Sequence, residues 1–92
     1  MQQPSDSAEA RIKAAFPFVL AYYDREIVKR ICEKHGLSVL DAYRKFLFSE
    51  TYAMLRDPAL EMWDFGCVGI FDMWEAENRT GDPRNSAYIA EA

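Results

Sequence analysis

Histidine and cysteine are scarce in this chain, which has 92 residues but only one histidine and two cysteines. Small secreted domains that rely on a disulfide framework usually contain more cysteines, so we expect Cys32 and Cys67 to be reduced thiols. A helical di-metal site normally needs a Glu-x-x-His pair on each of two helices. One histidine cannot supply both pairs, which argues against that class of metal centre.

Long apolar runs are also missing, and so is the alternation of apolar and polar residues that is typical of strands. No run approaches the ~20 apolar residues that a membrane span requires. The first residues, 1–6, lack the basic and then apolar pattern of a signal peptide. The sequence therefore predicts a cytoplasmic protein that has no sheet and makes no membrane contact.

Basic residues are outnumbered, with a net charge of −4 and an isoelectric point of about 4.9. Residues 1–49 carry eight basic and six acidic side chains, whereas residues 50–92 carry three basic and nine acidic ones. Proteins that bind nucleic acid normally have a basic face and a high isoelectric point, because neutralising phosphates dominates their affinity. The acidic balance disfavours nucleic acid as the partner.

Apolar residues are abundant enough for one packed core, since half of the chain is hydrophobic and 14% is aromatic. A chain of this length has room for one domain only. We expect a flexible N-terminal segment at 1–10, a single helical domain at 11–80 and a C-terminal tail at 81–92, in which Tyr88 and Ile89 could dock.

Helical spacing and capping residues divide the chain. Ser7 or Asp6 is expected to cap a short helix over 8–16, and Pro17 suits the first turn of a longer helix that ends at Gly36. The remaining boundaries are a helix start at Ser38, a bend with a new cap at Ser49, a break at Asp57-Pro58 and a cap at Asp64 for a last helix over 65–78. The pattern predicts an all-α fold, a small orthogonal or antiparallel bundle of three main helices plus one or two short ones.

Few side chains suggest chemistry. Cys32 and His35 have the spacing of half a zinc site, and Cys67 would have to complete it. The sequence leaves open whether these three residues converge. Asp64, Asp72 and Glu75 fit a solvated acidic helix face, with Glu75 paired to Arg79 one turn later. We therefore predict no catalytic residue, no metal ligand and no cofactor.

Residues 27–48 resemble a helix-turn-helix, and this region is the most basic part of the chain. Asp41, however, would lie near the start of the recognition helix, where phosphates and base edges approach. A DNA-binding regulator or antitoxin-like protein is therefore the alternative hypothesis rather than the first.

The aromatic residues exceed what one face of each helix can bury. The stretch 18–23 is apolar on all sides of its helix, and a helix of that kind is usually enclosed on all sides. The sequence therefore favours a non-enzymatic protein–protein interaction module whose partner is another protein chain, with a second copy of itself as one option. The expected patch consists of Phe18, Tyr22, Tyr23, Phe48 and Trp63.

Residues 46–57, with the sequence Phe-Leu-Phe-Ser-Glu-Thr-Tyr-Ala-Met-Leu-Arg-Asp, are followed by Trp63 and a final helix. This stretch resembles a loose group of short bacterial helical proteins of unknown function, some of which lie near toxin–antitoxin-type genes. The resemblance covers roughly residues 25–78 and departs from the group at residues 65–67. It implies a bacterial cytoplasmic helical protein that binds another macromolecule, and it assigns no catalytic residue.

Overall fold

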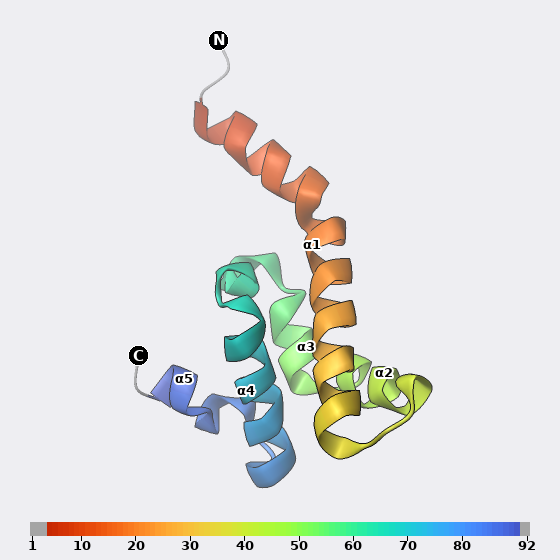
Figure 1. The fold of residues 1–92 in the computed structure, drawn as a ribbon. Helices are drawn as coiled ribbons and strands as arrows, with labels where there is room; N and C mark the ends of the chain where they lie inside the picture. The colour runs from red at the N-terminus through yellow and green to blue at the C-terminus, as the bar shows by residue number, and fades with distance from the viewer. Residues whose placement is uncertain (1–3, 91–92) are drawn as a thin grey trace.

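The computed structural model describes residues 4–90, and the fold in that range is all-α, without strands (Figure 1). Three helices are long enough to enclose a core: α1 (Pro4–His35), α2 (Val39–Leu47) and α4 (Gly66–Thr80). The shorter elements are α3 (Glu50–Leu55), α5 (Ala87–Ala90) and the 3-10 turns η1 (Pro58–Leu60), η2 (Met62–Asp64) and η3 (Pro83–Asn85).

Helix α1 is continuous through Pro17, so the prediction of two separate helices at this point was wrong. A proline inside a helix removes one backbone hydrogen bond and crowds the preceding turn, and it often bends the helix instead of ending it. Figure 1 shows α1 changing direction after its first third. The predicted flexible segment 1–10 overlaps α1 from Pro4 onward, and its residues 1–3 lie outside the described residues.

Local capping starts the middle elements where the sequence predicts. The Ser38 hydroxyl accepts the N–H of Asp41 at 3.2 Å, which begins α2. The Ser49 hydroxyl donates to the Phe46 carbonyl at 2.6 Å and accepts the N–H of Tyr52 at 3.1 Å, which produces the expected bend into α3. These bonds satisfy backbone N–H groups that a helix start leaves without partners.

The start of α4 differs from the prediction, because no side chain caps the helix from its own N-terminal turn. The cap comes from α1: the Tyr23 hydroxyl accepts the N–H of Gly66 at 3.0 Å and donates to the Trp63 carbonyl at 2.5 Å. Asp64 lies in η2 instead. A partner 43 residues away in sequence leaves no local signal.

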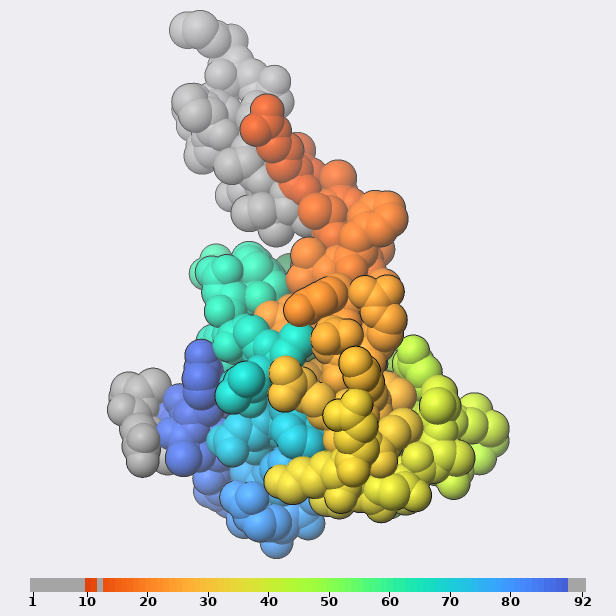
Figure 2. Space-filling model, in the orientation of Figure 1, coloured from red at the N-terminus to blue at the C-terminus, as the bar shows by residue number. Residues whose placement is uncertain are grey.

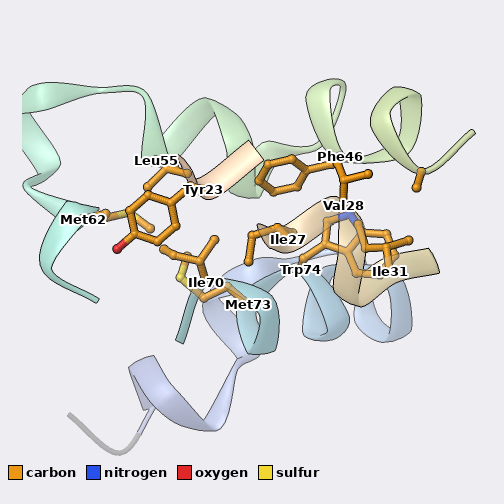
Figure 3. Packing of buried hydrophobic residues seen from close by; sticks show 11 residues of the cluster. Tyr23, Ile27, Val28, Ile31, Phe46, Leu55, Met62, Ile70, Met73 and Trp74 are labelled. Carbon is orange, nitrogen blue, oxygen red and sulfur yellow. The ribbon is translucent and has the colours of Figure 1, made fainter. Parts of the chain in front are cut away.

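The core lies where α1, α2, α3 and α4 meet (Figure 3). It contains Ile27 and Ile31 from α1, Phe46 from α2 and Ile70 from α4, all without solvent exposure. Burying one such side chain contributes roughly 1.5–3 kcal/mol. The other buried members are Tyr23, Val28, Ala42, Leu55, Met62, Met73 and Trp74.

Helix α4 also holds the N-terminus of α3. The Glu77 carboxylate accepts the N–H groups of Glu50 and Thr51, each at 2.9 Å, and the Thr51 hydroxyl at 2.7 Å. A carboxylate at a helix N-terminus is favoured both by these charge-assisted bonds and by the helix dipole. Arg84, in η3, adds an ion pair to Glu50 at 2.7 Å.

The C-terminal segment docks on α4, as predicted for Tyr88 and Ile89. The Tyr88 ring covers Gly69 so closely that a Cβ atom at position 69 would lie 2.8 Å from Tyr88 Cε1. The Tyr88 hydroxyl donates to the Phe65 carbonyl at 3.0 Å, and Ile89 packs against the core. Gly69, in the first turn of α4, therefore permits this close approach.

The first third of α1 projects from the rest of the molecule as an arm (Figure 1), and in Figure 2 the coloured atoms of residues 10–15 lead away from the other helices. Between residues 10 and 15, the side chains that the structure describes are all exposed. The principal extents are 53 × 30 × 18 Å, and the radius of gyration is 14.6 Å, compared with about 12 Å for a typical domain of this length. In residues 4–90 no helix combines the length and the apolarity that crossing a bilayer requires.

Candidate interaction surface

The five residues of the expected aromatic patch separate into two sets. Phe18, Tyr22 and Phe48 are exposed, at 78%, 49% and 89%. Tyr23 is only 3% exposed and belongs to the core, so the structure does not place it on the expected patch. Trp63 is half-buried and packs edge-on against Phe16, with ring centroids 5.8 Å apart.

The burial of Tyr23 follows from helical spacing. Tyr23, Ile27 and Ile31 lie four residues apart on one face of α1, and all three are buried. Tyr22 points away from that face. The neighbouring Cys67 side chain raises the pKa of Tyr22, first through hydrogen bonding and then through charge.

A groove of about 280 Å³ runs between α1 and α2. Its apolar lining comes from Val28 and Cys32 of α1 and from Val39 and Tyr43 of α2. We call it the α1–α2 groove, and its edges on α1 are formed by three charged side chains: Arg25, Lys29 and Glu33.

The packing of α2 explains why this groove is apolar and open. Ala42 and Phe46 turn into the core and have no solvent exposure. Val39, Leu40 and Leu47 are left 61%, 59% and 42% exposed. A nine-residue helix with apolar residues on more than its core face presents the surplus to solvent.

The helix surfaces around the groove carry both signs of charge. A shallow depression on α1 is lined by Glu26, Lys29, Arg30 and Glu33, two acidic and two basic residues. On α2, Asp41 pairs with Arg44 at 3.8 Å. The most basic stretch of the sequence is therefore interrupted by carboxylates on the folded surface.

A second depression, of about 320 Å³, lies where the C-terminal ends of α1 and α4 meet α2. It is lined by His35, Leu37, Lys45, Trp74 and Asn78. The His35 ring packs edge-on against Trp74, with centroids 5.5 Å apart.

Glu75 lies next to this depression and is 8% exposed, so the prediction of a solvated acidic face was wrong at this position. Its carboxylate contacts His35 Nε2 at 2.9 Å and Lys34 Nζ at 3.4 Å instead of Arg79. Asp72 is also engaged, because it accepts the Ser86 hydroxyl. These carboxylates stabilise contacts between elements.

Cys32, His35 and Cys67 have different surroundings. Cys32 lines the α1–α2 groove, His35 contacts Glu75, and Cys67 lies beside Tyr22. Among the side chains that the structure describes, no three or more of the types His, Cys, Asp and Glu are grouped so that they could hold a metal ion.

Asp24 is an unusual group on the inner side of α1. Its Oδ1 atom is buried and accepts no hydrogen bond from the described residues. Burial raises the pKa of Asp24, and burial followed by the Asp24 charge raises the pKa of Tyr52. Sequence spacing gave no warning of this buried carboxylate.

Comparison with known proteins gives no match to any protein-family model, to any curated protein or to any solved structure. The expected relationship to short bacterial helical proteins therefore stays a hypothesis. What the molecule does has to be inferred from the surfaces described above.

Proposed function

We propose that this chain is a small helical bundle that works as a non-enzymatic protein-binding module, with the α1–α2 groove as its binding surface. The observation that supports this most strongly is the outer surface of α2. Three of its aliphatic side chains, Val39, Leu40 and Leu47, are 42–61% exposed beside an apolar groove. Contiguous exposed apolar surface with a polar rim is typical of protein-binding sites.

The same surface fits a DNA-reading helix poorly. A recognition helix presents hydrogen-bonding or basic side chains to base edges and phosphates. Here α2 presents Val39 and Leu40 in its first turn, followed by Asp41. We therefore favour a protein chain over a duplex as the partner.

Binding in this groove would be driven by apolar anchors and oriented by charge. An anchor side chain between Val28 and Tyr43 would lose contact with water on both sides, as binding hot spots do. Arg25, Lys29 and Glu33 at the rim would contribute more to orientation and association rate than to affinity.

The experiment places a photoactivatable crosslinking residue at position 39 and, in a matched variant, at position 68. Val39 and Val68 are both exposed valines, at 61% and 68%, but Val68 lies on α4 outside the groove. Irradiation of each variant in extract from the source cells should give discrete adducts from position 39 and few from position 68. Equal labelling at both positions, or none at position 39, would contradict the proposal.

A further inference from the structure

The α1–α2 groove is small for a ligand site. At about 280 Å³ it lies at the lower end of the roughly 300–1,000 Å³ of pockets that bind drug-sized molecules. Its floor is apolar, and the charged side chains are confined to its rim. This geometry suits one or two apolar side chains that project from a partner protein.

Two of the three charged side chains at the α1 edge of the groove are positive. Arg25 and Lys29 are exposed and follow one another along α1, while Glu33 lies toward the C-terminal end. In the described part of the chain neither cation makes an ion pair. An occupant with an apolar tip and acidic flanks would complement both the floor and the rim.

The chain itself presents such a segment in residues 57–64, which we call the acidic turn. Leu60 is 47% exposed at its tip, and the carboxylates of Asp57, Glu61 and Asp64 are exposed around it. Residues 4–90 offer no ion-pair partner to any of these three carboxylates. The turn is held in place from below, where Met62 is buried and the Trp63 carbonyl accepts the Tyr23 hydroxyl.

The acidic turn and the groove cannot meet within one molecule. Figure 1 shows η1 and η2 on one side of α1 and α2 on the other side. Complementary patches on opposite sides of one chain pair head to tail between copies, and they do not form a closed two-fold dimer directly.

We propose that the groove's occupant is the acidic turn of a second copy, with Leu60 between Val28 and Tyr43 and with carboxylates facing Arg25 and Lys29. This assignment rests on the proposed function and names its partner. A single turn bound in a single groove buries little surface. The contact is therefore weak, with a dissociation constant of roughly micromolar to millimolar. Because exposed charges are screened by salt, association falls as ionic strength rises.

The test uses light scattering or sedimentation equilibrium of the full chain over a dilution series. The weight-average mass should rise with concentration above the 10.6 kDa of one chain, without stopping at a dimer, and should fall in 0.5 M salt. Two substitutions at exposed sites each remove one half of the contact. Val39→Asp adds a negative charge at the groove, and Leu60→Lys replaces the apolar tip.

Each of the two variants should stay monomeric alone, because a head-to-tail contact needs both halves. An equimolar mixture should form a one-to-one pair and nothing larger, since each variant retains the half that the other lacks. Val68→Asp, which makes the same change on α4, should associate like the wild type. Circular dichroism checks that all variants are folded.

Other outcomes overturn the assignment. A fixed dimer that survives both substitutions and dissociates with Phe18→Glu would place the interface on α1 around Phe18. A wild type that stays monomeric at about 1 mM while position 39 still crosslinks another protein would reject the second copy but retain the proposed function. A monomer without specific crosslinks would reject both.

Discussion

The contact between Glu77 and the start of α3 allows a quantitative prediction. Glu77→Gln keeps the shape of the side chain and removes its charge. The amide oxygen of the glutamine can still accept the N–H and the hydroxyl of Thr51. Its NH₂ group then faces the N–H of Glu50, and two donors cannot form a hydrogen bond. The loss is therefore one hydrogen bond and the charge assistance of the others, about 1–2 kcal/mol.

Glu77→Ala removes all three hydrogen bonds, which are 2.7–2.9 Å long in the wild type. It should lower the free energy of unfolding by about 2–3 kcal/mol. Thr51 is fully buried while Glu77 covers it, so its hydroxyl regains an acceptor only where the shortened side chain admits water. For a domain of this size, each kcal/mol lowers Tm by about 4–8 °C.

Urea and thermal unfolding followed by circular dichroism measure these losses. Glu61→Gln is the matched control, since Glu61 is exposed and makes no hydrogen bond through its side chain in the described part of the chain, and its effect should stay within about 0.5 kcal/mol. Thr51→Val removes one donor, and in a double-mutant cycle it should couple to Glu77→Gln by at least ~0.5 kcal/mol. If Glu77→Gln and Glu77→Ala both match the control, Glu77 does not hold α3.

Three further predictions concern stability. Burial raises the pKa of Asp24 above 3.8. Protonated Asp24 therefore stabilises the fold fully below pH 3.8, and this contribution is lost as pH rises through the folded-state pKa. Asp24→Asn should raise the free energy of unfolding, measured in urea, by about 0.5–1 kcal/mol at pH 7 but not at pH 3.5. Tyr23→Phe loses the hydrogen bonds to Trp63 and Gly66 and should lower the free energy of unfolding by about 1–2 kcal/mol in the same assay. An unchanged free energy of unfolding would show that Tyr23 does not cap α4. Gly69→Ala should displace the Tyr88 ring, which would be measured as a loss of hydrogen-exchange protection in α5. The same substitution should stabilise the protein by about 1 kcal/mol only when Tyr88→Ala is also present. Unchanged protection of α5 would refute the contact.

The boundaries that depend on neighbouring residues could be predicted from the sequence. Ser38 and Ser49 cap helices through hydrogen bonds to residues three positions away. The break at Asp57-Pro58 follows from the restricted backbone before proline and from an Asp57 side chain that accepts the N–H of Ala59. Such signals are local, so they can be read without knowing the fold.

The error at Pro17 has a local cause, because a proline can bend a helix without ending it. The other errors arose where distant residues decide the outcome, and Tyr23 caps α4 in place of Asp64. Glu75 was expected on a solvated face, but His35 and Lys34 approach it from α1. No pattern along one helix can reveal a partner that the fold supplies.

The candidate surface was partly foreseeable. The surplus of aromatic residues indicated exposed apolar area, and Phe18, Tyr22 and Phe48 are exposed. Tyr23 was misplaced although its spacing with Ile27 and Ile31 already pointed to the core. The groove itself could not be predicted, because it depends on how closely α2 approaches α1.

The most direct test of the binding surface is a dilution series of the full chain followed by backbone amide NMR. Concentration-dependent shifts should cluster at two places, residues 25–43 around the α1–α2 groove and residues 57–64 of the acidic turn, and should shrink together in high salt. Shifts confined to the residues around Phe18 would contradict this binding surface. So would spectra that do not change with concentration, together with groove amides that do not shift when other proteins are added.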